Sequence, residues 1–344
     1  MIFLLLFAVI IFGTSSQGLT QNRNDIDQWL NENQCSTSVR FTNHDFNFFS
    51  KPVCEIRESL KGEQPKQIKF MDGTWQVMVT AVSSKTSDDA IDFELKCTLE
   101  SGISPQTSIS VDFTFNNWSR SNYVLMPGAT YNGNRFESRR IFYSPKLLDP
   151  RDIGPDKPPV ISDIPRLNIN DGPSRIQERS GSMSVPAIGF QSLETQTGFW
   201  LLTDQATKYG DTGIGIEESR DRKTAVISLT VPVVRENYQY IITDNQAPSV
   251  DKSPDFQPGD EVTLKFRVYF FRSSDIQGLF NRFMVIRNDL GAKITHTPFL
   301  PFRPAFRYRS RNLMSKTGWK RMDIIQLVCA RTFCRIGKLA GPAA

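Results

Sequence analysis

The stretch IDFELKCTL, residues 91–99, alternates apolar and polar side chains without a break. Successive side chains of a β-strand point to opposite faces of a sheet, so this alternation predicts a strand with one buried and one solvated face. The same period of two recurs at 109–115 and 262–270, and shorter candidates lie at 75–82, 198–203, 225–231 and 238–243. Strands of this kind belong to antiparallel sheets. So many of them predict a mainly β fold, an antiparallel β-sandwich of two sheets packed face to face.

One amphipathic helix follows the last of these strands. Its apolar positions recur at helical spacing, at Ile276, Leu279, Phe280, Phe283 and Ile286. Ser273 or Ser274 is placed to cap the helix, and Asn288 and Gly291 are placed to end it. A single helix after a sheet domain either covers the sheet or connects it to another domain, and both interpretations remain open.

The N-terminus has the pattern of an export signal. Residues 2–12 are an uninterrupted apolar run of eleven, and small residues follow at 13–16. This is typical of a secretory signal peptide cleaved after Ser16. The run is too short to cross a bilayer, which takes about 20 apolar residues. We therefore expect a signal peptide over residues 1–16, export to the periplasm or the extracellular space, and no membrane insertion.

Charge is unevenly distributed along the chain. Residues 307–344 hold nine Lys or Arg and one acidic residue, whereas the rest of the chain is mildly acidic. A basic tail can bind nucleic acid, but this one lacks spaced aromatics and follows an export signal, so we expect no nucleic-acid partner. The tail is either natural or the product of a frameshift near Phe306. In the shifted frame the Met322-Asp323 codons always encode glycine, and we favour an out-of-frame, disordered tail over 307–344.

Cofactor motifs are absent from the sequence. There is no phosphate-binding P-loop, no dinucleotide fingerprint and no HExxH motif, and the two histidines, His44 and His296, leave little room for a zinc site. We expect no cofactor and no metal. Export permits a disulfide between Cys35 and Cys54, with unpaired thiols as the alternative. Cys97 falls on the apolar face of its strand, where a buried free thiol is expected.

The densest cluster of polar and aromatic side chains is YNGNR, residues 131–135. A tyrosine ring can stack on a pyranose, asparagine amides can pair with sugar hydroxyls, and arginine can bind a carboxylate with two hydrogen bonds. Asn-Gly is also a strong hairpin signal, so a turn and a site are both open interpretations. We take Tyr131, Asn132, Asn134 and Arg135 as candidate ligand-binding residues.

Arg175 is a further candidate for ligand binding. It stands just after a segment, Pro145–Pro173, that holds seven of the twenty prolines. A loop of that length either forms a site or is a structural crossover, and Arg175 has an ion pair with one of its aspartates as the structural alternative. Glu217 and Glu218, as neighbours on a strand, would face opposite ways. Sequence spacing shows no two carboxylates converging, so the catalytic residues stay unassigned. Trp118 and Trp200 are expected in the core.

Four segments carry a resemblance to a known class of proteins: YVLMPGATYNGNRF (Tyr123 to Phe136), LLDPRDIGPDKPPVISDIPRLN (Leu147 to Asn168), DGPSRIQ (Asp171 to Gln177) and GFWLLTDQATKYGDTGIGIEES (Gly198 to Ser219). They resemble exported bacterial glycoside-hydrolase-like proteins with an N-terminal β-supersandwich and a C-terminal (α/α)6 toroid. The resemblance covers roughly residues 75–306. It implies a sandwich domain over 17–272 and, over 273–306, a helix and linker toward a missing helical domain.

Two functions follow from these observations. The first is the β-domain of a glycoside-hydrolase-like protein, which is inactive alone and whose intramolecular partner is the missing (α/α)6 domain. Its ligand is a polysaccharide or oligosaccharide, acidic or neutral. The second is a self-sufficient carbohydrate-binding or adhesion-type sandwich without enzymatic activity.

Overall fold

The computed structural model describes residues 23–45, 51–61, 65–84, 87, 89–135, 139–141, 160–162, 166–172, 174–235 and 251–289. All of them belong to the first of two units into which the chain divides, Met1–Leu290. The signal peptide, the expected strand at 238–243, much of the proline-rich segment and the basic tail lie outside the described residues.

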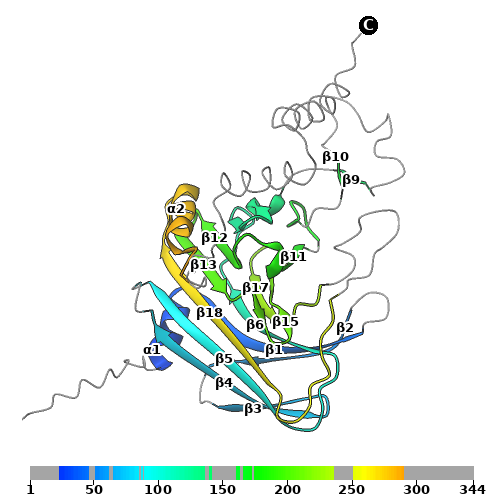
Figure 1. Ribbon diagram of the computed structural model, residues 1–344. Helices are drawn as coiled ribbons and strands as arrows, with labels where there is room; N and C mark the ends of the chain where they lie inside the picture. Colours follow the sequence, from blue (N-terminus) through cyan, green and yellow to red (C-terminus); the bar gives the residue numbers. More distant parts are fainter. Residues whose placement is uncertain are drawn as a thin grey trace, which may run out of the picture. The chain divides into compact units, whose positions relative to one another are not determined.

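Two antiparallel sheets form a β-sandwich (Figure 1), which confirms the expected fold class. The six-stranded sheet has the order β11 (Ser174–Arg179), β16 (Gly213–Glu218), β17 (Ala225–Val231), β6 (Thr107–Phe115), β1 (Cys35–Asp45) and β2 (Lys51–Ser59). The eight-stranded sheet has the order β3 (Lys66–Phe70), β4 (Gly73–Ser83), β5 (Ala90–Ser101), β18 (Glu261–Arg272), β13 (Thr197–Thr203), β12 (Ala187–Ser192), β7 (Tyr123–Met126) and β8 (Thr130–Tyr131).

Two small sheets accompany the sandwich. The strands β14 (Ala206–Thr207) and β15 (Gly210–Asp211) form an antiparallel pair, and β9 (Arg139–Ile141) and β10 (Val160–Ser162) form a parallel pair. The second pair joins a segment just before the proline-rich stretch to a segment within it.

Residues 91–99 form part of a strand with one buried face, as their alternation predicts. In β5, Phe93, Leu95 and Cys97 are buried, while the polar residues between them are only partly buried. β18 pairs with β5 in a register that sets Phe266 opposite Phe93, and the two rings stack at 5.2 Å. Matching alternation in neighbouring strands therefore gives the eight-stranded sheet one continuous apolar face.

Aromatic side chains join the two sheets. Phe113 of the six-stranded sheet contacts Phe199 and Phe266 of the eight-stranded sheet, with ring centroids 6.2 Å and 5.8 Å apart. Phe115 packs edge-on against Phe190 at 4.9 Å. Offset and edge-to-face ring pairs of this kind contribute about 0.5–1.5 kcal/mol each beyond the area that they bury. The core of the sandwich thus lies between the inward faces of the two sheets.

The predicted helix is α2 (Ile276–Ile286), and it covers the outward face of the eight-stranded sheet (Figure 1). Trp200 stacks on Phe283 at 4.9 Å, and its Nε1 donates to the carbonyl of Leu279 at 3.3 Å. Leu279 is fully buried in this second apolar cluster. The helix thus covers the sheet, and its expected role as a connector to another domain stays a prediction.

The expected cap of α2 at Ser273 or Ser274 is wrong. Asp275 is the N-cap, and its carboxylate accepts a hydrogen bond from the backbone N of Gly278 at 2.8 Å. The hydroxyl of Ser273 donates instead to the backbone carbonyl of Asp275 at 2.9 Å. An aspartate at this position also brings a negative charge to the positive end of the helix.

A second helix, α1 (Arg23–Glu32), packs on the sandwich near β1 through Ile26, Trp29 and Leu30. The Trp29 ring meets Phe270 edge-on at 4.8 Å. Neither helix of the described part of the chain is long and apolar enough to cross a membrane.

The disulfide between Cys35 and Cys54 does not form. Cys54 of β2 lies opposite Asn43, whereas Cys35 lies at the far end of β1. Eight residues of strand separate the two positions, about 27 Å at roughly 3.4 Å per residue, far beyond the reach of a disulfide. Cys97 is a buried free thiol, as expected.

Candidate functional site

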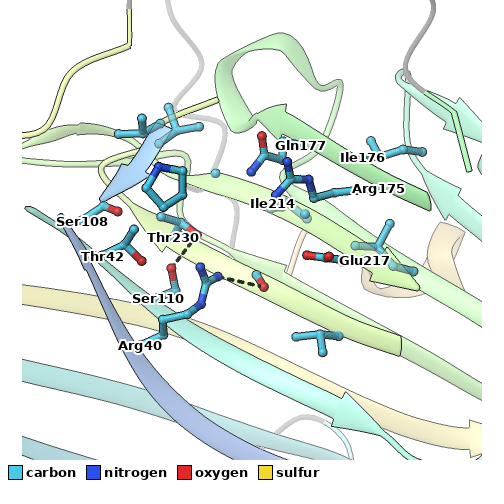
Figure 2. Close-up of a pocket in the computed structure, with 18 of the residues that line it drawn as sticks. Arg40, Thr42, Ser108, Ser110, Arg175, Ile176, Gln177, Ile214, Glu217 and Thr230 are labelled. Atoms are coloured by element: carbon cyan, nitrogen blue, oxygen red, sulfur yellow. Dashed lines mark hydrogen bonds between the residues drawn. The ribbon is translucent and has the colours of Figure 1, made fainter. Parts of the chain in front are cut away.

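The outward face of the six-stranded sheet is polar, in contrast to its inward face. Along β1 the inward residues are Val39 and Phe41, and the outward residues are Arg40, Thr42 and His44. Side chains from all six strands line a pocket of about 400 Å³ on this outward face (Figure 2). We call this pocket the outer trough; its polar side chains include those of Arg40, Thr42, His44, Glu55, Arg57, Ser108, Ser110, Arg175, Gln177, Glu217, Ser228 and Thr230.

A glycine keeps the floor of the outer trough open. Gly213 and Gly215 occupy two of the three outward positions of β16, and Glu217 occupies the third. At Gly215 the strand backbone itself forms the floor, whereas the side chain of Val233 lies over Gly213. A Cβ atom at Gly215 would lie 3.2 Å from the carbonyl oxygen of Ile176. A larger side chain at Gly215 would therefore project into the trough.

Asp112 lies beneath the trough with a fully buried side chain. Its carboxylate accepts hydrogen bonds from Arg40, at 2.7 Å from Nε and 3.1 Å from Nη2, and it forms an ion pair with Arg57 at 3.1 Å. Glu55 pairs with Arg40 at 3.2 Å. Two guanidinium groups and two carboxylates thus neutralise one another at this end of the trough.

The pKa of Arg40 shows that this group stays charged. Burial alone would lower that pKa, but the charge and hydrogen bonds of Asp112, followed by those of Glu55, outweigh burial and raise it above its ordinary value. A guanidinium fixed by two carboxylates has little freedom to turn toward a ligand. Arg40 therefore gives the trough rigid N–H groups and no excess of positive charge.

Hydroxyl groups line the middle of the trough. Ser110 of β6 and Thr230 of β17 hydrogen-bond to each other at 2.8 Å (Figure 2), and Ser108 hydrogen-bonds to His44 Nε2 at 2.7 Å. Ser228 accepts from Arg40 at 3.3 Å. A hydroxyl can donate one hydrogen bond and accept two. This row can therefore match a ligand that itself carries many hydroxyl groups.

Arg175 and Glu217 stand at the other end of the trough. They are directly opposed in the β11–β16 ladder, and both point outward (Figure 2). The carboxylate of Glu217 is exposed and forms no hydrogen bond or ion pair within the described residues. Among the five residues that the sequence singled out, Arg175 is the one that the structure places in the outer trough.

The segment 131–134 forms a tight turn after β8. Asn132, Gly133 and Asn134 all have left-handed backbone conformations, with φ of 53°, 59° and 51°. The amide of Asn134 closes the turn, since its Oδ1 accepts from Tyr131 N at 3.1 Å and its Nδ2 donates to Ala129 O at 3.4 Å. Tyr131 is 55% exposed. The segment is a turn, as one interpretation expected, but it connects no hairpin, because β8 pairs with β7 and β9 pairs with β10. A ligand at Tyr131 or Asn132 stays a prediction.

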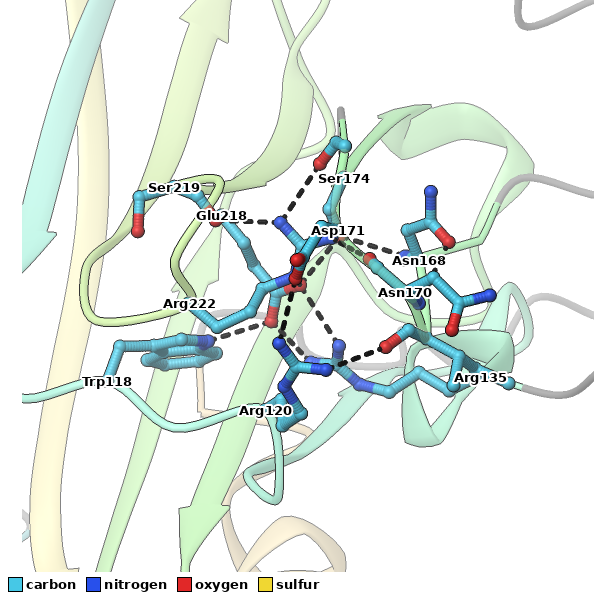
Figure 3. Close-up of polar contacts among 12 residues, drawn as sticks. Trp118, Arg120, Arg135, Asn168, Asn170, Asp171, Ser174, Glu218, Ser219 and Arg222 are labelled. Carbon is cyan, nitrogen blue, oxygen red and sulfur yellow. Dashed lines mark hydrogen bonds and ion pairs between the residues drawn. The ribbon is translucent and has the colours of Figure 1, made fainter.

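Arg135 binds internally to Glu218 (Figure 3). The carboxylate of Glu218 also accepts hydrogen bonds from Trp118 Nε1 at 2.7 Å and from Ser174 Oγ at 2.6 Å, and Arg222 lies 3.5 Å away. Glu218 points inward from β16 while its neighbour Glu217 points outward, so the expected opposition of these two residues is confirmed. Arg135 and Arg175 therefore act on opposite faces of the six-stranded sheet.

Burial alone would raise the pKa of Glu218. The hydrogen bonds and charge of Arg135, with the hydrogen bonds of Ser174 and Trp118, outweigh burial and hold that pKa below its ordinary value. Glu218 is thus a charged, fully coordinated structural carboxylate. Trp118, one of its donors, is 5% exposed, and Trp200 is fully buried, so the expected core positions of both tryptophans are confirmed.

The end of the proline-rich segment is attached to this cluster. Arg222 donates to the carbonyls of Asn170 and Gly172, at 2.6 Å and 3.0 Å, and Arg120 donates to the carbonyl of Ile169 at 3.1 Å (Figure 3). These bonds hold residues 169–172 at the start of β11. The aspartates that were the alternative partners of Arg175 lie outside the described residues.

Most residues of the outer trough were not found from the sequence. The outward positions of residues 107–115 carry serines and an aspartate. A face that is merely solvated would tolerate any polar residue, so this choice of residues was the signal for a site that the sequence offered. The other positions come from β17, which the alternation did reveal, and from β1, β2, β11 and β16, which it did not. Within the described ranges, no group of three or more His, Cys, Asp or Glu side chains could hold a metal ion.

An antiparallel β-sandwich with a polar trough on one outward face is the class of structure that these observations define. No family model and no curated protein matches the chain. Solved structures similar to it include the Slr1438 protein from Synechocystis sp. PCC 6803 (9% identity, TM-score 0.32, covering 61% of this chain and 66% of that one) and an aldose 1-epimerase candidate from Escherichia coli K12 (9% identity, TM-score 0.35, covering 70% and 84%). Another is a galactose mutarotase related enzyme from Lactobacillus acidophilus (10% identity, TM-score 0.28, covering 59% and 63%). TM-scores of this size assign neither a family nor a function to the chain.

Proposed function

We propose that this chain binds an oligosaccharide in the outer trough, as the β-domain of an exported glycoside-hydrolase-like protein. The observation that carries the proposal is the row of hydroxyl, guanidinium and carboxylate groups on adjacent strands around a pocket of about 400 Å³. That volume lies in the range of small-molecule sites, about 300–1,000 Å³. Sugars present closely spaced hydroxyls, and such a surface supplies both donors and acceptors for them.

The arrangement favours binding over hydrolysis. A glycosidase needs two carboxylates that act on one bond, about 5–5.5 Å or about 6.5–9.5 Å apart. In the trough, Asp112 and Glu55 are held in ion pairs with Arg40 and Arg57. Of the carboxylates on the outward face, Glu217 keeps an open position among the described residues. Glu178 and Glu218 also line the pocket, but both are at buried, inward positions of their strands. We therefore propose that the chain binds sugar without cleaving it.

Titration calorimetry of the full chain against oligosaccharides of about six sugars tests the proposal. We expect saturable binding that is lost in Gly215→Leu, because leucine fills the floor of the trough. Thr80→Leu serves as a control, since Thr80 is an exposed residue of β4 in the other sheet and lies outside the trough. Saturable binding that is equal in Gly215→Leu and in the native chain would place the ligand elsewhere.

The out-of-frame origin of residues 307–344 is a second part of the proposal. Those residues lie outside the described ranges, so the proposal rests on their charge and on the glycine that the genetic code forces at Met322-Asp323 in the shifted frame. The nucleotide sequence downstream of the Phe306 codon tests it. We expect a long open frame there, one base out of register, with helical periodicity. A downstream sequence without such a frame would favour the self-sufficient binding module.

A further inference from the structure

We infer that the outer trough takes neutral rather than acidic oligosaccharides; the inference rests on the proposed function and names the ligand class. It comes from the balance of charge on one sheet face. Three guanidinium groups, Arg40, Arg57 and Arg175, face outward with the carboxylates of Glu55 and Glu217, and the carboxylate of Asp112 lies beneath Arg40 and Arg57. The described charged groups of the trough therefore carry no excess of positive charge.

Arg40 and Arg57 are held by carboxylates of the protein itself. Arg40 makes two hydrogen bonds to Asp112 and one to Glu55, and Arg57 is 3.1 Å from Asp112. An acidic sugar is normally bound by an arginine that offers two parallel N–H groups to the ligand carboxylate. To do that here, Arg40 would have to leave Asp112 buried without its main partner, and an unpaired buried charge is costly.

The third guanidinium group stands beside an open carboxylate. Arg175 is paired in register with Glu217, whose side chain is exposed. An acidic ligand at Arg175 would thus approach a like charge, whereas a neutral ligand would offer hydroxyl donors to Glu217. A hydrogen bond to a charged acceptor contributes more than one between neutral groups. Glu217 therefore favours neutral, hydroxyl-rich ligands.

The part of the pocket wall that the structure describes contains no Trp, Tyr or Phe side chain. The ligand would consequently be held by the edges of its rings, through hydroxyl hydrogen bonds, and not by stacking. This mode requires no ligand charge and gives an affinity with little dependence on salt, since screening acts on interactions between charges.

Binding of the full chain to two probe sets tests the inference. The neutral set holds cello-, xylo- and manno-hexaose, and the acidic set holds hexagalacturonate and a hyaluronan hexasaccharide, each measured by calorimetry at about 0.05 M and 0.5 M NaCl, conditions that change the Debye length severalfold. We expect a neutral probe to bind with an affinity that changes less than about twofold with salt. Glu217→Gln should weaken that binding about tenfold, whereas Glu94→Gln, on the other sheet, should leave it unchanged.

The outcomes separate the inference from the proposed function. Binding of acidic probes alone, weakened by salt and by Arg175→Ala, would overturn the neutral class and leave the sugar-binding trough standing. Binding of neutral probes that Glu217→Gln leaves unchanged would overturn the role of Glu217. Binding of neither set would overturn the proposed function together with the inference.

Discussion

Arg135 and Glu218, 83 positions apart in the sequence, form an ion pair in which the side chains are 7% and 0% exposed. The pair joins the turn after β8 to the inward face of β16. Ser174, which also binds Glu218, precedes Arg175, just as Glu218 follows Glu217. The buried cluster therefore fixes the register of the two strands that present Arg175 and Glu217 to the outer trough.

Loss of this ion pair should destabilise the chain strongly. In Arg135→Ala the carboxylate of Glu218 stays buried without its main partner, and we expect a loss of about 3–5 kcal/mol in the free energy of unfolding, measured by urea denaturation. Arg120→Ala is the matched control, since its pair with Asp171 is exposed, at 52% and 84%, and should cost about 1 kcal/mol or less. Equal losses in the two variants would contradict the structural role of the pair.

Acid should destabilise the protein through Glu218 and Asp251. Burial tends to raise both pKa values, but Arg135 with Ser174 and Trp118, and Arg235 with Arg179, outweigh it and hold them below their ordinary values of 4.5 and 3.8. A carboxyl with a lowered pKa stabilises the fold above its ordinary pKa and loses that contribution as the pH falls through the lowered value.

Urea midpoints between pH 7 and pH 3 test this dependence. We expect stability to be constant near neutral pH and to fall below about pH 4.5, where the two carboxyls of the unfolded chain begin to take up protons. Glu218→Gln should start from a lower stability and lose less of it on acidification. If the curves of the variant and the native chain ran parallel, Glu218 would not be the acid-sensitive group.

Substitution of Gly215, on the floor of the trough, should leave the sandwich folded. Gly215 has an ordinary strand conformation, and its Cβ would press on the carbonyl of Ile176 by only a few tenths of an ångström. We expect Gly215→Ala to cost about 1 kcal/mol or less and to reduce oligosaccharide binding only partly, while Gly215→Leu abolishes it. Unchanged circular dichroism in both variants is the control, and full binding by the leucine variant would show that the trough is not occupied.

The three cysteines of the sandwich should differ in reactivity. Cys35 and Cys97 are buried, and burial raises the pKa of each thiol well above its ordinary value, whereas Cys54 is exposed. Because the thiolate is the reactive species, we expect iodoacetamide at pH 8 to label Cys54 in the native chain and to spare the other two, as read by peptide mapping. Rapid native labelling of Cys35 would contradict the packing of β1 against the core.

Alternation revealed the strands that have one apolar and one polar face. β5, β6, β17 and β18 fall within two residues of the expected spans. β12 was missed because all six of its residues are buried, between the core and the layer that contains α2. In β16, two glycines interrupt the pattern. α1 was missed because only three apolar side chains anchor its ten residues.

The candidate site was harder to predict, for a topological reason. Its central hydroxyls belong to Ser110 and Thr230, which are 120 positions apart and become neighbours because β17 lies next to β6. Periodicity identifies a strand but not its neighbour in the sheet. Arg175 was predicted as a ligand-binding residue because turn residues precede it. Arg135 was predicted because its neighbours in the sequence are polar, although its guanidinium group is buried.

A crystal structure of the full chain with its best-binding neutral hexasaccharide tests the central claim most directly. The claim predicts sugar density in the outer trough, with ligand hydroxyls within hydrogen-bond distance of Glu217 and of the pair formed by Ser110 and Thr230. Ordered sugar against Tyr131 or elsewhere, with the trough free of ligand, would contradict it.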